Sequence, residues 1–271
     1  MSEALHIPRS WNRSGRWRIF PDEPRDGPTN MAIDEMLVLG CAQGFSPPTL
    51  RIYGWSVPTV SLGYNQPLHE VDLTACRQRG IPVVRRPTGG RALLHHQELT
   101  YSLVLPISSG SRGVLHDYQW IAHCLLLGLR KLGVAATLSR GDHSKADAGG
   151  LCFLSPSRYE LTVDGRKLIG SAQRRFSQAL LQQGSLLIQI EYSSWIALFP
   201  HGKELDARAT ALQPLLGRSP SWEEMVNAMR AGFEECTGVQ LELGGLTARE
   251  WAMAQGLVTQ RYGSHEWTSR R

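Results

Sequence analysis

The sequence predicts a fold that mixes strands with helices. Short apolar runs bounded by turn residues, such as Trp17–Phe20, are typical of strands. Apolar residues at helical spacing predict an amphipathic helix over Tyr118–Leu132. Asp164-Gly165 lies between two apolar runs and indicates a β-hairpin. With 271 residues, the chain is long enough for one large α/β domain, or for a domain with a small appendage.

The first third of the chain predicts a strand, a helix, two strands and a short helix. Asn30 is placed to cap the first helix, and we attribute Asp34 and Glu35 to the helix dipole, which favours acidic residues in the first turns. Cys76 is expected to be a buried thiol. The other predicted segments are Trp17–Phe20, Leu50–Tyr53, Thr59–Leu62 and a helix over Asp72–Gln78.

The rest of the chain continues this alternation. Gly170–Gln173 is expected to lead into a turn, and Ser221 and Thr247 are expected to cap helices. The predicted strands are Leu99–Leu105, Val134–Leu138, Tyr159–Val163, Lys167–Gly170 and one or two strands in Ala179–Ile190; the predicted helices are Tyr118–Leu132, Ser221–Cys236 and Thr247–Ala254.

Composition excludes several classes of protein. Hydrophobic residues make up 42% and charged residues 20%, which is ordinary for a globular domain. We expect no membrane span, because no run of about 18 apolar residues occurs, and no signal peptide. Five irregularly spaced cysteines suggest a reducing cytoplasm rather than disulfides or zinc. The net charge of +5 is mild and could favour acidic protein partners, and no motif points to nucleic acid.

The stretch Arg85–Ser102, which reads RRPTGGRALLHHQELTYS, is the strongest candidate for a site. A strand that leads into Gly89-Gly90 lets backbone N–H groups approach a ligand closely. Arg85 and Arg86 beside this turn suit a carboxylate, a phosphate or a polarised carbonyl. The alternative is an ordinary hairpin with solvated arginines, but paired arginines before the glycines and His95 after them favour a site.

The same stretch resembles the lipoate–protein ligase and octanoyltransferase family, whose pattern is two arginines, a glycine turn and a His followed by an acidic residue. His96 stands where that family usually has Asp. GRKLIGSAQRR resembles another motif of the family and makes Lys167 the lysine at the acyl site. CFLSPSRYEL resembles the cysteine-dependent octanoyltransferases, and the resemblance makes Cys152 the nucleophile. Gln183-Gly184-Ser185 matches the family's His-Gly-Ser, with Gln in place of His.

This resemblance implies an α+β fold with mixed, mostly antiparallel sheets packed with helices, related to biotin–protein ligases. We divide the chain into a polar extension at residues 1–16, a catalytic domain at residues 17–217 and a C-terminal helical segment at residues 218–271 that packs on the catalytic domain. The implied activity transfers an octanoyl or lipoyl group to a lysine of a small carrier domain, such as the glycine cleavage H protein.

The implied mechanism uses octanoyl-acyl carrier protein as the donor. Cys152 attacks the thioester while Lys167 and the Gly89-Gly90 turn polarise the carbonyl. The route needs no ATP or other cofactor, and we expect a cytoplasmic monomer. His95 could shuttle a proton, although a structural histidine is the simpler interpretation. Trp55, Tyr64 and Asn65 could line an apolar pocket, or Trp55 could be core. Arg85 and Arg86 could help to hold the loop or the acyl head group. The remaining residues expected to bind substrate are Gly170, Ser171 and Ala172.

Three alternatives remain open. In the first, the protein is a lipoate–protein ligase that uses ATP and magnesium and for which Cys152 is incidental; the end of the chain at Arg271 leaves little room for the accessory domain of many such ligases. In the second, it moves octanoyl between two carrier proteins. In the third, it is a carrier-binding protein of the same fold without catalytic activity.

Overall fold

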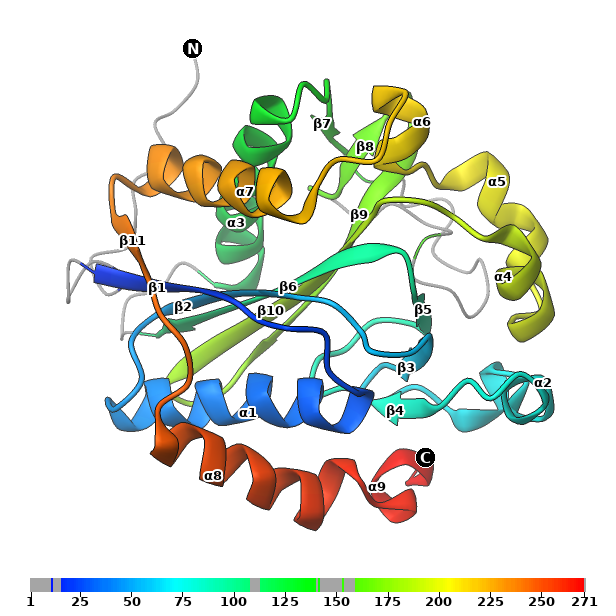
Figure 1. The fold of residues 1–271 in the computed structure, drawn as a ribbon, viewed down its shortest axis with the longest axis horizontal. Coiled ribbons are helices and arrows are strands. Elements are labelled where there is room, and N and C mark those ends of the chain that lie inside the picture. The colour runs from blue at the N-terminus through cyan, green and yellow to red at the C-terminus, as the bar shows by residue number, and fades with distance from the viewer. Residues whose placement is uncertain are drawn as a thin grey trace.

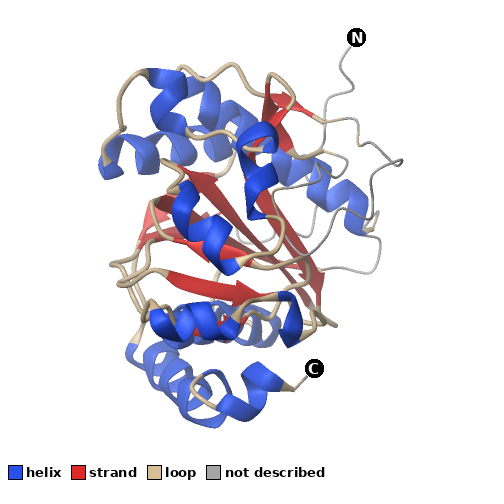
Figure 2. Ribbon diagram, turned by 90° about the vertical axis from the view of Figure 1, so that its right-hand side faces the viewer, coloured by secondary structure: helices blue, strands red, loops and turns tan. Residues whose placement is uncertain are grey.

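The computed structural model describes residues 16–107, 113–139 and 159–270, together with Trp11, Gly141 and Phe153. Its centre is an eight-stranded sheet in the order β11-β1-β2-β6-β10-β9-β8-β7, with helices on both faces (Figures 1 and 2). The pairs β1/β2 and β1/β11 are parallel, and the others in this sheet are antiparallel. The eight strands are β1 (Arg16–Pro21), β2 (Thr49–Tyr53), β6 (Glu98–Pro106), β7 (Thr137–Leu138), β8 (Leu161–Val163), β9 (Arg166–Arg175), β10 (Ala179–Leu187) and β11 (Gln240–Leu243).

A smaller three-stranded sheet and the helices complete the fold. The small sheet has the order β4-β3-β5 and consists of β3 (Thr59–Leu62), β4 (Val83–Arg85) and β5 (Leu93–His95). The α-helices are α1 (Gly27–Gln43), α2 (Leu73–Gln78), α3 (Val114–Lys131), α4 (Tyr192–Leu198), α5 (Leu205–Arg208), α6 (Leu212–Leu216), α7 (Trp222–Thr237), α8 (Ala248–Leu257) and α9 (His265–Ser269). Shorter turns are η1 (Leu68–Glu70), η3 (Gly202–Glu204) and η4 (Val258–Tyr262).

These elements confirm the predicted α+β class with mostly antiparallel pairing. Among the described helices, none is long and apolar enough to cross a membrane. The Asp164-Gly165 hairpin is confirmed, since both residues have positive φ between β8 and β9. The capped helices at Ser221 and Thr247 are also confirmed, and each carries a full capping box.

Three boundary predictions are wrong. The first helix begins at Gly27, because the Asp26 side chain accepts from the Thr29 N–H, and Asn30 lies buried inside the helix. Strand β9 runs through Gly170–Gln173 to Arg175, where we predicted a turn, because all of these residues pair with β10. The Val134–Leu138 strand shortens to β7 (Thr137–Leu138). The one or two strands predicted in Ala179–Ile190 are one strand, β10 (Ala179–Leu187).

The large sheet has two chemically different faces. In β6, Leu99, Tyr101 and Leu103 point to one side and belong to the main hydrophobic core, which α3 and α7 cover. Glu98 and the residues of the same parity point to the other side, toward α1 and the small sheet. Figure 1 shows α3 and α7 on one side of the sheet and α1 and α8 on the other. Both faces are buried, so the polar face must satisfy its side chains within the protein.

A β-bulge determines which face Lys167 points to. Leu161 pairs with Ile169, but the next residue of β8, Thr162, pairs with Lys167, so that Leu168 is the extra residue of β9. Paired residues point to the same side of a sheet. Lys167 therefore points away from the Ile169 side and shares the polar face with Gly170 and Ala172.

The C-terminal segment contributes both to the sheet and to the polar side. Strand β11, which the sequence analysis missed, pairs in parallel with β1. Helix α8 packs on α1, and α9 reaches β4 of the small sheet (Figure 1). The predicted domain boundaries at residues 16 and 217 stay a prediction.

Candidate functional site

A pocket lies where the polar face of the large sheet meets α1 and the small sheet. Its cavity volume is about 30 Å³. Trp55 lines the pocket, so its side chain is part of the pocket wall, one of the two interpretations left open by the sequence. The pocket is lined by Met31, Tyr53, Trp55, Arg86, Leu93, His95, Thr100, Gly170, Ser171, Ala172, Gln183, Gly184 and Ser185.

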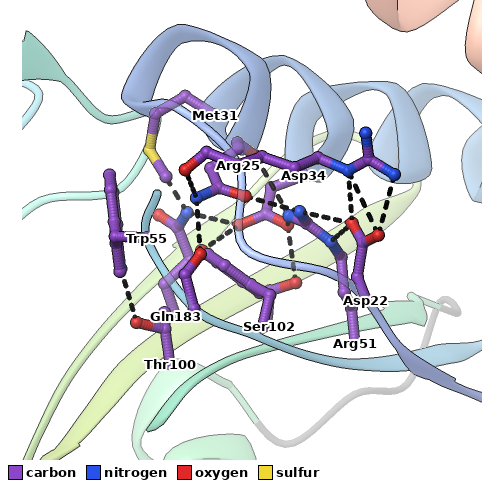
Figure 3. A network of polar contacts seen from close by, with 12 residues as sticks. Asp22, Arg25, Met31, Asp34, Arg51, Trp55, Thr100, Ser102 and Gln183 are labelled. Atoms are coloured by element: carbon purple, nitrogen blue, oxygen red, sulfur yellow. Dashed lines mark hydrogen bonds and ion pairs between the residues drawn. The ribbon is translucent and has the colours of Figure 1, made fainter. Parts of the chain in front are cut away.

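Asp34 of α1 is the centre of a buried polar network beside this pocket (Figure 3). Its carboxylate accepts from the Tyr53 hydroxyl at 2.9 Å, the Ser102 hydroxyl at 2.7 Å and Arg51 at 2.8 Å. Asp34 and Arg51 are fully buried. The assignment of Asp34 to the helix dipole is therefore wrong, because the carboxylate points into the protein. The same is true of Glu35, which accepts from the Tyr262 hydroxyl and pairs with Arg261.

Arg51 links this network to a second carboxylate. It donates to Asp22 at 2.8 Å and to Asn30 Oδ1 at 2.6 Å. Burial lowers the pKa of Arg51, but the charges of Asp34 and Asp22 outweigh that effect and raise the pKa above its usual value. Arg51 thus stays cationic and balances the buried carboxylates.

Gln183 of β10 connects the Asp34 network to the glycine turn. Its Nε2 donates to Asp34 Oδ2 at 2.7 Å, and its Oε1 accepts from the Thr88 hydroxyl at 2.6 Å. A single amide therefore bridges α1 and the RRPTGG loop through both of its polar atoms. Position 183 is the one where the resembled family has His, so this departure lies in the pocket wall. His96, the other departure, is exposed and outside the pocket.

A second chain of hydrogen bonds runs through Glu98 and His95. His95 Nδ1 lies 2.6 Å from Glu98 Oε1, and His95 Nε2 lies 2.7 Å from the Ser61 hydroxyl. The Trp55 ring stacks on His95 with centroids 3.9 Å apart. Burial raises the pKa of Glu98, but His95 and two hydroxyl donors outweigh it and lower the pKa. With both ring nitrogens engaged by protein groups, His95 is built into the pocket wall, which favours the structural interpretation over proton transfer.

Arg86 and Arg85 hold the backbone of the glycine turn. Arg86 donates to the Gly89 carbonyl at 2.7 Å, to the Arg91 carbonyl at 2.8 Å and to the Ser61 hydroxyl. Arg85 donates to the carbonyls of Gly63, Gln66 and Thr268. Both side chains are buried. These contacts fix the loop in place, and Arg86 also forms part of the pocket wall.

The glycine turn requires close backbone contacts. A Cβ on Gly63 would lie 1.9 Å from the Gly90 carbonyl oxygen, so only glycine allows β3 to approach the turn this closely. Gly90 has φ of 82°, in the left-handed region, and a Cβ there would lie 3.4 Å from that of Ala172. The turn is thereby held against the wall of the pocket formed by β9.

Lys167 lies buried on the polar face beyond the pocket. Its Nζ donates to Glu160 Oε1 at 2.6 Å and lies 5.5 Å from the centre of the Phe153 ring. Both members of the ion pair are nearly inaccessible to solvent. Cys152, the predicted nucleophile, lies outside the described residues. Among the residues that are described, no group of His, Cys, Asp and Glu could hold a metal ion.

The chain matches the lipoyl protein ligase A/B catalytic domain over residues 26–234. It belongs to that family. It is 44% identical over 270 residues to the octanoyltransferase LipM of Symbiobacterium thermophilum, covering 94% of this chain and 98% of that protein. It is 40% identical over 272 residues to the LipM of Kyrpidia tusciae, with 94% and 99% coverage. These relatives identify the protein as an enzyme, an acyltransferase.

Solved structures of this family share the fold. Lipoate-protein ligase A bound with ATP superposes with a TM-score of 0.83 at 22% identity, covering 94% of this chain and 98% of that one. The bipartite lipoate protein ligase of Thermoplasma acidophilum gives 0.79 at 22% identity, with 94% and 96% coverage. At such identities the likeness establishes the fold of the lipoyl protein ligase catalytic domain.

The structure brings some of the predicted site residues of this family member together and leaves others apart. The pocket wall contains Arg86, His95, Gly170, Ser171 and Ala172. Lys167, Arg85, Tyr64, Gly89 and Gly90 are not part of that wall. Their roles in substrate binding stay predictions, as does the role of Cys152.

Sequence analysis missed Asp34, Glu98 and Gln183 as pocket-supporting residues. One pattern in β6 indicates these residues. Polar side chains occupy every second position of the segment ELTYS, at Glu98, Thr100 and Ser102, in an otherwise apolar strand. We interpreted Leu99–Leu105 only as a strand. The alternation predicts a polar face, but only the fold shows that α1 buries it.

Proposed function

We propose that this enzyme transfers an octanoyl group from octanoyl-acyl carrier protein, through an acyl-cysteine at Cys152, to a lysine of a lipoyl-carrier protein such as the glycine cleavage H protein. The observation that carries the proposal is the 44% identity to an octanoyltransferase over nearly the whole of both chains. The similar ligase from T. acidophilum belongs to a lipoylation system that was analysed with its E2 lipoyl domain, which supports a lipoyl-domain acceptor.

In the first step, the Cys152 thiolate attacks the thioester carbonyl of the donor. The acyl–sulfur bond to the donor breaks, and the donor thiol leaves as its thiolate. Lys167 donates a hydrogen bond to the oxyanion that forms. Its ammonium is held by Glu160 on a face shared with Gly170 and Ala172, which line the pocket. Phe153, which follows Cys152 in the chain, has its ring 5.5 Å from Lys167 Nζ, and this supports the pairing of the two residues.

In the second step, the neutral amine of the acceptor lysine attacks the octanoyl-cysteine. The amide forms, Cys152 leaves as a thiolate, and the proton that the amine loses passes to water. The pocket between Trp55, Met31 and Gly184 is lined mainly by apolar surface and suits the hydrocarbon chain during both steps. The route uses no ATP and no other cofactor.

The decisive experiment is intact-protein mass spectrometry after the enzyme is mixed with octanoyl-acyl carrier protein, without ATP. The wild type should gain one octanoyl group and pass it to added H protein, whereas Cys152→Ala should gain none. Cys76→Ala is the matched control, because Cys76 is a buried thiol of α2 and should leave the adduct unchanged. Modification of H protein only with free lipoate and ATP would contradict the proposal and indicate a ligase.

A further inference from the structure

Two arginines enclose an aromatic ring at the rim of the glycine turn. Arg174 of β9 lies over the Tyr64 ring at 3.9 Å, and Arg270, next to α9, lies over the same ring at 4.0 Å. Arg174 donates to the Pro87 carbonyl, and Arg270 donates to the Tyr64 carbonyl. The two guanidinium groups are thus fixed on the loop that follows β3 and on the RRPTGG turn.

These two cations have no acidic partner in the part of the chain that is described. The ion pairs there use other arginines, such as Arg261 with Glu35 and Arg91 with Glu70. Arg270 Nε is buried and makes no hydrogen bond to the described residues. A buried charged donor without an acceptor is unfavourable unless a ligand supplies one. Hydrogen bonding from Arg174, followed by the charges of both arginines, lowers the pKa of Tyr64, consistent with a locally positive field.

The cluster is close to the pocket. Ala172 lines the pocket, and Arg174 is two residues further on the same face of β9, about 7 Å along the strand. Tyr64, Arg174 and Arg270 are half-buried, so a ligand can reach them from solvent. An anionic group here would lie beyond the mouth of the pocket, as the remote end of a long substrate would.

The C-terminal segment is what brings Arg270 to this position. The Trp267 indole donates to the Arg85 carbonyl at 3.0 Å, and Arg85 in turn donates to the Thr268 carbonyl at 2.9 Å. Arg270 also lies 3.6 Å from the centre of the Trp267 ring. Reciprocal contacts of this kind fix the end of the chain on the glycine turn, so Arg270 does not depend on a flexible tail for its placement.

We propose that Arg174 and Arg270 form a binding site for the phosphate group of a phosphopantetheine thioester donor. Planar guanidinium groups recognise phosphate through paired, charge-assisted hydrogen bonds. This inference rests on the proposed function, because it assumes a thioester donor carried on phosphopantetheine. It adds that the enzyme recognises the arm of the donor as well as its acyl chain, and that the C-terminal segment supplies part of the donor site.

The test compares two donors that differ in the phosphate alone, and adds coenzyme A as a larger phosphorylated donor. Transfer to H protein is measured with octanoyl-pantetheine, octanoyl-4′-phosphopantetheine and octanoyl-coenzyme A. Wild-type kcat/KM should be at least about 10-fold higher with the phosphorylated arm, mostly through KM. Arg174→Ala and Arg270→Ala should remove most of this preference, because kcat/KM should fall more with octanoyl-4′-phosphopantetheine than with octanoyl-pantetheine. The lysine variants should keep part of it because they keep the charge. Octanoyl-coenzyme A should behave like octanoyl-4′-phosphopantetheine.

Arg249→Ala is the matched control. Arg249 also stacks on an aromatic ring, Phe45 at 3.9 Å, but lies at the start of α8. The Arg249→Ala variant should show the same preference among the three donors as the wild type. Equal use of the two pantetheine donors by the wild type would overturn the inference, as would equal losses with both donors in the alanine variants. A preference for coenzyme A alone would also overturn it. Failure of octanoyl-acyl carrier protein itself to acylate the enzyme would refute the proposed function, and with it the assignment of this site.

Discussion

The two faces of the large sheet are built from the same strands, but one face is an apolar core and the other is a hydrogen-bonded polar network. Toward α3 and α7, side chains such as Leu103 pack in a continuous apolar core. Toward α1, their neighbours Glu98, Thr100 and Ser102 are equally buried but hydrogen-bonded to one another or to Asp34. Burial of apolar area stabilises the first face, but this interaction is non-directional and does not fix the orientation of the side chains. The second face is stable only if each polar group finds its partner, and those partners fix the geometry of the pocket.

This comparison predicts its largest effect at Arg51. Arg51→Met should lower the free energy of unfolding by about 3–5 kcal/mol, because Asp22 and Asp34 would lose the cation that balances them in a buried site. Lys131→Ala is the control, since Lys131 pairs with Glu235 at 2.6 Å while both are half exposed. That change should cost less than about 1 kcal/mol. Urea unfolding of both variants measures the two losses in the free energy of unfolding. Equal losses would show that the buried ion pairs of the polar face stabilise the fold no more than an exposed pair does.

Adjacent residues of β6 offer a sharper comparison. Leu103→Ala should cost about 2–5 kcal/mol of stability by leaving a cavity under α3, with the activity of the folded enzyme nearly unchanged. Ser102→Ala should cost only about 1 kcal/mol, because Asp34 keeps its other donors. Its octanoyl transfer should nevertheless fall by several-fold, since Asp34 helps to place Gln183. If stability and activity fall together in both variants, the two faces do not have the separate roles of stabilising the fold and positioning the pocket.

The stability contributed by the ion pair between Glu250 and Arg18 should depend on pH. Glu250 of α8 binds Arg18 of β1 at 2.8 and 2.9 Å and accepts from Ser46 at 2.6 Å. Burial raises the pKa of Glu250, but these hydrogen bonds, that of the Thr247 N–H and the Arg18 charge outweigh it and lower the pKa to about 2. The pKa in the unfolded chain is near 4.3, so the unfolded state takes up the proton first and the stabilisation is lost as pH falls from about 5 toward 2.

Glu250→Gln tests that linkage. The variant should be about 1–3 kcal/mol less stable than the wild type at pH 7, because a charge-assisted pair becomes a neutral one. The difference should shrink as the pH approaches 2, where the wild-type carboxyl is protonated as well. Urea midpoints measured from pH 7 to pH 2 give the result. A difference that stays constant with pH would mean that the charge of Glu250 does not stabilise the fold.

The two faces also explain how far sequence reasoning could go. Apolar periodicity located α3 and α7, and local turn chemistry located the Asp164-Gly165 hairpin. Motif resemblance singled out the glycine turn and Lys167, whose roles in the reaction stay predictions. These are local patterns, and each has a sequence period or a spacing that can be read directly.

The polar face could not be predicted in the same way. Asp34 lies in the second turn of a helix, where an acidic residue is explained equally well by the dipole or by solvent. Its partners come from β2, β6 and β10, at separations of 17, 19, 68 and 149 residues. The sequence leaves open whether Arg85 and Arg86 hold the loop or the acyl head group, because their carbonyl partners depend on the path of the loop. Strand β11 is short, and only its pairing with β1 makes it a strand.

A change at Gln183 should affect activity more than stability, and it separates positioning from packing. Gln183→Leu keeps the size of the side chain but removes the bridge between Asp34 and Thr88, so kcat/KM for octanoyl transfer should fall by about 10-fold with less than about 2 kcal/mol of lost stability. Gln183→His should stay within about 3-fold of the wild type, because imidazole also offers two polar atoms to the same partners. If the leucine variant is fully active, the bridge does not position the turn, and the polar face serves the fold alone. If both variants fail equally, the amide itself is required, and its replacement of histidine reflects a requirement particular to this enzyme.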